Sequence, residues 1–231
     1  MTQAALLATT ISQFVAGCKT DGIWDPIKAC CIMAAWDGLA GALYPLKGPA
    51  PTNFNFVAGD YDRETGLVGD GSTKYLDSNR NRTSDPQDSM HIGVYLTGVN
   101  SVGGRSVFGN GNLTTQAGAT HYRISTGSDG YYRHSQAAAA VFNLSIPSSG
   151  LIAINRGSSV SSQLRQSGVT TTYSGISDGR LDQNLHIYKS AGVSFGTDAR
   201  LAFYSIGESL DLALLDTRVS DLITAIGAAI P

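Results

Sequence analysis

From residue 90 to residue 206, the chain repeats short segments in which apolar and polar side chains alternate. In the first of them, Met90, Ile92, Val94 and Leu96 alternate with polar or small residues, which is the pattern of a half-buried β-strand. Similar segments follow at Ser106–Phe108, Thr120–Thr126, Ala140–Leu144, Leu151–Asn155, Gln163–Arg165, Thr170–Tyr173, Leu185–Tyr188 and Ala199–Ile206. Clusters of Gly, Ser, Asn and Asp separate them at the spacing typical of a sandwich or barrel. Because few helical stretches lie between them, we expect antiparallel strands and an all-β fold.

The amino end of the chain has helical periodicity instead. One apolar face of the expected helix comprises Leu7, Ile11, Phe14, Val15 and Cys18. Asp25-Pro26 then supplies an N-cap and a first-turn proline, which predicts a second, short helix that runs toward Met33.

The carboxyl end is also predicted to be helical. Asp211 can cap this closing helix, and its apolar stripe comprises Leu215, Val219, Leu222, Ile223 and Ile226. Such an amphipathic helix must lie against an apolar surface. That surface is either the sheet of its own domain or a neighbouring subunit.

The length of 231 residues fits one large all-β domain. Residues 45–89 are rich in Pro, Gly and Asp, and they predict long loops with short strands at Phe54–Val57 and Lys74–Leu76. We therefore predict a single structural domain. Residues 1–35 form its N-terminal helical segment, and residues 36–231 form the β-sandwich with the closing helix.

Charge and composition exclude several classes of function. The net charge is −2 and only 15% of the residues are charged, with no cluster of Lys and Arg dense enough for nucleic-acid binding. No apolar run approaches 18 residues, so we expect no membrane insertion. The amino end lacks the features of a signal peptide, and the odd number of cysteines argues against a disulfide framework. We therefore expect synthesis and assembly in a cytoplasm.

The residues that carry catalysis in most hydrolases are sparse. Glu64 and Glu208, the only glutamates, lie far apart in the sequence, and the E-x-D-x-x-E strand motif of β-sandwich glucanases is absent. No G-x-S-x-G motif occurs, and the four histidines lack metal-ligand spacing. The sequence therefore predicts no enzymatic activity.

Two segments are candidates for ligand binding. Tyr131, Tyr132, Arg133 and His134 could offer aromatic faces and planar donors to a sugar, although a strand whose tyrosines pack at a rim explains them as well. The acidic loop that contains Asp60, Asp62 and Glu64 has oxygen donors that suit Ca²⁺, and its alternative is a solvated turn. Calcium is the only cofactor that the sequence suggests.

Three stretches, in order along the chain, are similar to segments of known protein families. Residues 22–29 (GIWDPIKA) resemble an element that follows the amino-terminal helix in a family of tailed-bacteriophage proteins, the phage family below. Residues 66–77 resemble the G-x-G-x-x-x-Y-[IL]-D strand-turn-strand of concanavalin-like and laminin-G-like domains. Residues 201–211 are similar to the phage family's strand before its closing helix. The resemblance implies a jelly-roll-like, concanavalin-like sandwich and membership of virion structural proteins.

From this resemblance we expect a virion component, either a head-decoration protein or a part of a tail or fibre. Its partners would be other virion proteins and further copies of itself, with the apolar stripe of the closing helix as the anchor. The alternative is a carbohydrate-binding adsorption module that recognises host surface glycans. A glycan hydrolase or lyase is a third alternative, which the residues disfavour.

Overall fold

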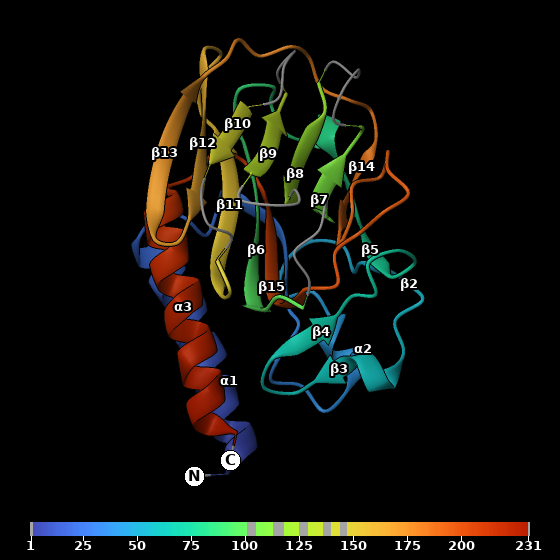
Figure 1. The fold of residues 1–231 in the computed structure, drawn as a ribbon. Coiled ribbons are helices and arrows are strands. Elements are labelled where there is room, and N and C mark those ends of the chain that lie inside the picture. Colours follow the sequence, from blue (N-terminus) through green and yellow to red (C-terminus); the bar gives the residue numbers. More distant parts are fainter. Residues whose placement is uncertain are drawn as a thin grey trace.

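The computed structural model describes residues 2–100, 105–112, 118–124, 129–135, 140–143 and 147–230, which form three layers. Two β-sheets pack face to face, and two long helices lie against one of them (Figure 1). The helices are α1 (Gln3–Thr20), α2 (Leu39–Ala42) and α3 (Leu212–Ala229), with two 3₁₀ turns, η1 (Ala58–Asp60) and η2 (Arg82–Ser84).

Among the described residues, eight strands form the first sheet and seven form the second. The first comprises β1 (Ile27–Ile32), β3 (Tyr61–Asp62), β4 (Gly66–Val68), β6 (Met90–Gly98), β11 (Gly150–Arg156), β12 (Ser161–Gln166), β13 (Val169–Ser174) and β15 (Arg200–Gly207). The second comprises β2 (Thr52–Phe54), β5 (Tyr75–Asn81), β7 (Arg105–Asn110), β8 (Thr120–Ile124), β9 (Asp129–His134), β10 (Ala140–Asn143) and β14 (Asn184–Ile187).

The first sheet runs in the order β13-β12-β11-β6-β15-β4-β3, and β1 pairs with the other half of β15. The second runs in the order β10-β9-β8-β7-β14-β5-β2. Every pair of named strands in the described chain is antiparallel, for example β6 with β15 and β11 with β12. The predicted antiparallel β-sandwich with helical ends is confirmed.

The central strands of the first sheet, β6, β11 and β15, are buried on both faces. Its inner face, with Ile92, Val94 and Tyr204, packs against the second sheet. Its outer face, with Leu151 and Phe203, packs against the helices. The alternation in β6 predicted a strand with one face in water, whereas residues on the other face are also buried, such as His91, whose ring nitrogens lie within hydrogen-bond distance of the Glu208 carbonyl oxygen and Ser205 Oγ.

The structure corrects the predicted second helix. Residues 27–32 form strand β1, which pairs with β15 near the other end of the chain. Ala29 and Cys31 face the core between the sheets, while Cys30 and Ile32 face the helices. A short run that is apolar on both faces has no periodicity that distinguishes a strand from a helix, so the local Asp-Pro signal misled the prediction. The first 35 residues thus supply both a helix and a strand of the sandwich.

The two long helices pack side by side, and the described ends of the chain lie close together (Figure 1). Asp211 caps α3 as predicted, because its side chain accepts hydrogen bonds from the amides of Ala213 and Leu214 at 2.8 and 3.1 Å. Toward the same end of the pair, Arg218 of α3 donates to Asp21 after α1 at 2.6 Å. No described helix is long and apolar enough to cross a membrane.

Candidate functional site

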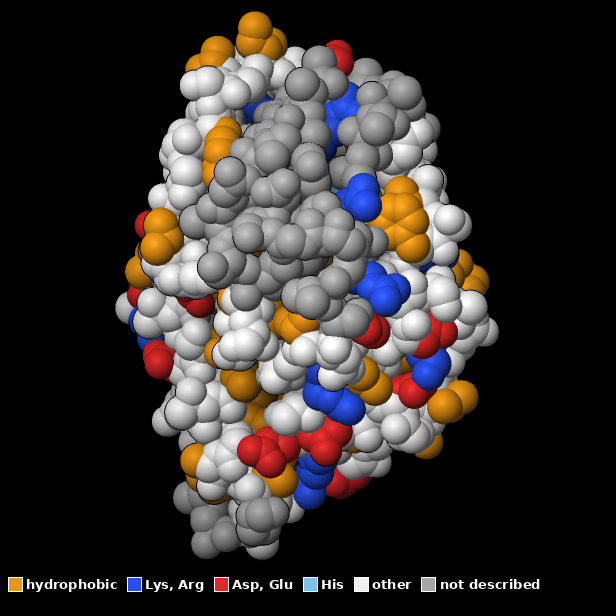
Figure 2. Space-filling view, in the orientation of Figure 1, with side chains coloured by type: hydrophobic (Ala, Val, Ile, Leu, Met, Phe, Trp, Pro, Cys, Tyr) orange, Lys and Arg blue, Asp and Glu red, His pale blue; other side chains and the backbone are white. Residues whose placement is uncertain are grey.

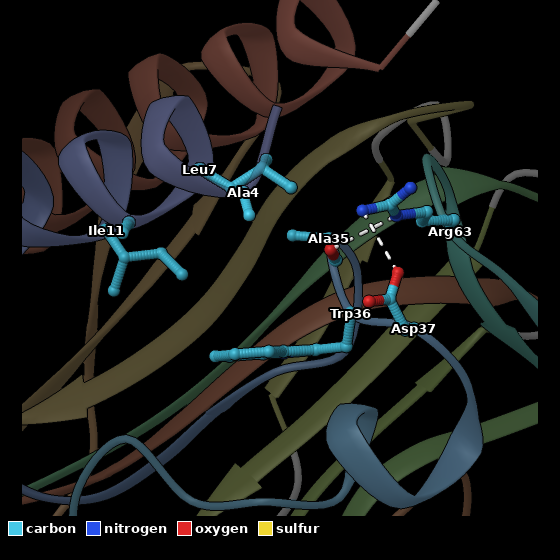
Figure 3. A pocket seen from close by; sticks show the side chains of 8 residues that line it. Ala4, Leu7, Ile11, Ala35, Trp36, Asp37 and Arg63 are labelled. Atoms are coloured by element: carbon cyan, nitrogen blue, oxygen red, sulfur yellow. Dashed lines mark hydrogen bonds and ion pairs between the residues drawn. The ribbon is translucent and has the colours of Figure 1, made fainter. Parts of the chain in front are cut away.

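A pocket of about 370 Å³ opens between the first half of α1 and the loop that follows β1. Its lining residues come from three separate stretches of the sequence and comprise Ala4, Leu7, Ala8, Ile11, Ala35, Trp36, Asp37 and Arg63. In Figure 3 the apolar side chains of α1 form one wall, the indole of Trp36 lies across from them, and Arg63 and Asp37 meet at one end. The pocket is therefore mostly apolar with a charged pair at its rim.

Trp36 is held by its neighbours on several sides. Its Nε1 donates to the carbonyl oxygen of Ile32, the last residue of β1, at 2.6 Å. Gly41 of α2 lies so close to Trp36 that a Cβ added at residue 41 would be only 2.6 Å from the Cβ of Trp36. Ala35 precedes it with φ at +78°, a conformation that non-glycine residues rarely adopt and that turns the chain sharply after the strand. The half-buried indole is thus fixed before any ligand binds.

Arg63 ties the three stretches of the pocket together. It lies in the turn between β3 and β4, and its guanidinium donates to Gln3 Oε1 at 2.8 Å and to the Ala35 carbonyl oxygen at 3.4 Å. Its Nη2 is 3.1 Å from Asp37 Oδ1. The side chain of Arg63 is one-third exposed, whereas that of Asp37 is 90% exposed. The guanidinium has five N–H donors in a planar fork, so donors remain for a ligand at the rim.

This geometry matches a site for a small amphipathic ligand. Such sites are concave and mainly apolar, with a few polar groups that fix the orientation of the ligand. An indole face accepts the C–H face of a sugar ring, while a carboxylate and a guanidinium form hydrogen bonds with hydroxyl groups. Charges of both signs are interspersed on the face of the molecule in Figure 2, and no large patch of one sign gathers there.

The Tyr131–His134 segment does not form the exposed sugar platform that the sequence suggested. It is strand β9, and Tyr132, Arg133 and His134 are at most 2% exposed. The hydroxyl of Tyr132 lies 3.1 Å from Ser162 Oγ, and its ring meets Tyr173 edge-on at 5.1 Å. The side chain of Tyr131 lies outside the described residues. The segment is a strand, as in the alternative interpretation, but Tyr132 packs in the core between the sheets and not at a rim.

The acidic loop also has a structural role. Asp60 pairs with Lys74 and accepts the Val57 amide at 2.8 Å. Asp62 accepts hydrogen bonds from the hydroxyl of Thr65 and from the amides of Thr65 and Glu64, and these bonds lower the pKa of its carboxyl group. Within the described ranges, no group of three or more His, Cys, Asp or Glu side chains could hold a metal ion. Asp60 and Asp62 thus stabilise the loop through their side chains, whereas the third predicted calcium ligand, Glu64, has an exposed side chain.

The apolar stripe of the closing helix is not a free docking surface. Leu215, Val219, Leu222 and Ile226 are buried, and Ile223 is partly buried beside them. They pack against α1 and the outer face of the first sheet, which is one of the two surfaces that the sequence left open. The anchor predicted for neighbouring subunits is therefore occupied within the chain.

No protein-family model matches the chain, and no curated protein matches its sequence. Solved structures do resemble its fold. A mutant Trypanosoma rangeli sialidase with trans-sialidase activity is 10% identical with a TM-score of 0.56, and the match covers 86% of this chain and 34% of that one. The sialidase in complex with sialic acid is 11% identical with a TM-score of 0.53, over 86% and 33%. The binding domain of botulinum neurotoxin serotype D is 11% identical with a TM-score of 0.52, over 85% and 51%.

These neighbours share the β-sandwich fold, and the chain spans about a third of the length of the sialidases that it matches. They also correct the prediction that the chain has no enzymatic activity. That prediction took the absence of the glucanase carboxylate motif as sufficient evidence against catalysis. The structures that share this fold, however, include sialidases. At such low identity the likeness shows the fold alone, and it assigns no reaction to this chain.

The sequence reasoning did not find Trp36, Asp37 or Arg63. The available signal was a Trp-Asp-Gly turn directly after an apolar run, at residues 36–38. The distant partners, Arg63 and the apolar face of α1, carry no local mark of a shared site. Only the packing of α1 beside β1 brings them together.

Proposed function

We propose that this protein is a carbohydrate-binding module and that the Trp36 pocket is its sugar site. The observation that carries the proposal is the combination of a fixed indole, an opposing apolar wall and a guanidinium–carboxylate pair at one rim. One sugar ring would stack on the indole, and its hydroxyls would bind Asp37 and the remaining donors of Arg63.

The fold neighbours support a module of this kind without naming its ligand. One of them is a sialidase with bound sialic acid, and another is a toxin's binding domain. The β-sandwich holds the pocket on a rigid frame, because Trp36 and Ala35 directly follow β1 and Arg63 lies between β3 and β4. A preformed site loses little conformational entropy when a ligand binds.

The apolar wall favours sugars that carry an apolar substituent. Ala4, Leu7, Ala8 and Ile11 offer no hydrogen bonds, so a ring with hydroxyls on every side would leave them unused. An N-acetyl group would bury its methyl there while the ring stays on Trp36. We expect N-acetylated oligosaccharides to bind more tightly than plain glucose oligosaccharides.

Fluorescence titration tests the proposal directly, because the chain has only two tryptophans. In a Trp24→Phe variant, Trp36 is the remaining reporter, and chitooligosaccharides should change its emission in a saturable way. Glucose oligosaccharides and sialyllactose serve as the comparison ligands. Equal affinity for glucose and N-acetylated oligosaccharides would remove the proposed preference while leaving the site intact.

Substitution of the indole gives the second arm of the test. Trp36→Ala should lower the affinity, measured by calorimetry, by at least about tenfold, because the stacking face is lost. Trp24→Ala is the matched control, since Trp24 lies outside the pocket and packs with Lys47 over its ring. If no oligosaccharide binds, or if both variants bind as the unchanged protein does, the proposed site is wrong.

We also propose that the module belongs to a virion, as an adsorption or structural component that meets host surface glycans. The support is the order of three motifs along the sequence, at residues 22–29, 66–77 and 201–211. Mass spectrometry of purified particles should detect the chain at a fixed copy number, and a labelled antibody should locate it on the head or tail. Its absence from washed particles would contradict this role.

A further inference from the structure

Strand β13 ends the first sheet with an unprotected edge. No strand of the described chain pairs with its outer side, and that side is open in Figure 1. Its sequence, Val-Thr-Thr-Thr-Tyr-Ser, contains no charge and no proline, the devices by which proteins usually block an exposed edge. In Figure 2 the upper left flank, where this edge lies, is mostly uncharged.

The hairpin geometry shows which backbone groups this edge offers. β12 and β13 are joined by Ser167 and Gly168, both with positive φ (+50° and +74°), as in a two-residue turn of the favoured type. The residues that flank such a turn, Gln166 and Val169, form a hydrogen-bonded pair. The direction of the backbone hydrogen bonds alternates from residue to residue along the strand. Thr170, Thr172 and Ser174 therefore direct their N–H and C=O groups away from β12, toward the open edge.

We infer that this edge pairs with the same edge of a second copy, antiparallel about a two-fold axis that passes between the two Thr172 residues. In this register Thr172 faces Thr172, and Thr170 faces Ser174 of the second copy. On the inner side, Tyr173 faces Thr171 of the second copy. Pairs of Thr with Thr or Ser, and of an aromatic with a β-branched residue, are among those that stabilise antiparallel sheets.

Self-complementarity is the reason to choose a second copy as the partner. A two-fold axis opposes identical surfaces, so any charge on the edge would meet itself, and β13 has none. The nearest cation, Arg165, is already bound within its own chain to Asp216 at 2.7 Å and to Thr170 at 2.9 Å. The edge therefore brings no like charges together.

Exposed apolar side chains flank the edge at both ends of the register. Val169 is 58% exposed and Ile176 is 76% exposed. Pairing about Thr172 places Val169 of one copy opposite Gly175 of the second, and Ile176 lies one residue beyond that pair. The joined strands would make the two sheets continuous.

Cysteine cross-linking tests both the partner and the register. In a Thr172→Cys variant, the two introduced residues would have Cα atoms about 5.5 Å apart, within the range for a disulfide. Mild oxidation should therefore give a covalent dimer. Thr170→Cys is the matched control on the same strand face, because the two copies of residue 170 would be separated by about 13 Å. A dimer from Thr170→Cys, or none from Thr172→Cys, would overturn the proposed register.

Sedimentation analysis gives an independent readout of the association. The unchanged protein should form dimers, and Thr172→Lys should lower the association constant by at least about tenfold because two lysines would face each other. Thr217→Lys, on the exposed face of α3, adds the same charge away from the edge and should leave the dimer intact. A protein that stays monomeric at its highest soluble concentration contradicts the inference, whether or not it binds sugars.

Discussion

Two aromatic groups in this protein have similar composition and opposite environments. The segment Tyr132-Arg133-His134 is buried in β9, where Tyr132 bonds Ser162. The group of Trp36, Asp37 and Arg63 is assembled from a loop and a turn around an open pocket. Aromatic rings beside planar donors therefore do not define a sugar site by themselves. What defines it is a ring face that neighbouring strands leave uncovered.

The position of each group in the fold explains the difference. β9 lies inside the second sheet between β8 and β10, and its inward residues meet the first sheet. Trp36 comes after β1 has ended, where α1 is the next covering layer and leaves a gap. The first group should therefore control stability, and the second should control binding.

The largest effect is expected from Tyr132→Ala. Removal of a fully buried aromatic ring leaves a cavity and removes the contact between its hydroxyl and Ser162, so the free energy of unfolding should fall by about 3–5 kcal/mol. Denaturant titration measures this change. Tyr44→Ala is the control, because Tyr44 is 71% exposed and its loss should cost at most about 0.5 kcal/mol. A similar loss of unfolding free energy in both variants would contradict the proposed difference between core and surface aromatic residues.

The second-largest effect is expected from acid, which should lower the stability of the folded protein through its buried histidines. Burial lowers the pKa of His91 to about 4, below its ordinary value of 6.5, so the folded state favours the neutral ring. Stability is then fully present above pH 6.5, and it falls by about 3 kcal/mol as the pH drops to 4. Burial lowers the pKa of His134 in the same way.

Denaturant titrations at a series of pH values measure this dependence, and His91→Gln should flatten it. The pocket lining contains no histidine, so the titration of the buried histidines should not itself change the sugar affinity while the chain remains folded. A stability that does not change between pH 6.5 and 4 would show that the buried histidines titrate normally.

A smaller effect is expected from Gly41→Ala, which alters the pocket without changing its lining residues. The new methyl would lie 2.6 Å from the Cβ of Trp36, so the indole must shift. We expect a stability loss of about 1–3 kcal/mol from overpacking and a weaker binding of sugar. Gly59→Ala is the control, because nothing lies within 4 Å of its added Cβ. Calorimetric binding that is equal in both variants would show that the position of Trp36 is unimportant.

Asp37→Asn should have the smallest effect on stability. The Asp37 side chain is 90% exposed, and exposed ion pairs contribute at most about 1 kcal/mol. Sugar affinity should nevertheless decrease, since the charged acceptor at the rim becomes a neutral amide. Thermal unfolding and calorimetry measure the two quantities separately. An unchanged affinity would place Asp37 outside the site and narrow the proposal to Trp36 and Arg63.

Local sequence patterns were sufficient for most of the strands and for both long helices. Residues such as Ile92 and Val94 alternate because β6 has one face in the core, and Asp211 begins α3 because its side chain binds the first free amides. These signals operate over a few residues. Strands β1 and β3 were missed, because β1 is apolar on both faces and β3 is only two residues long.

The sequence by itself determined the antiparallel strands and the helical ends, since the period of the side chains follows from the geometry of one strand or one helix. Tertiary structure alone decided which strands are buried on both faces and which aromatic side chains remain accessible in a pocket. β1 is a strand because it pairs with β15, Tyr132 is buried because two sheets meet there, and Trp36 meets Arg63 because α1 lies beside the loop after β1. Those contacts join residues far apart in the chain, and no local pattern encodes them.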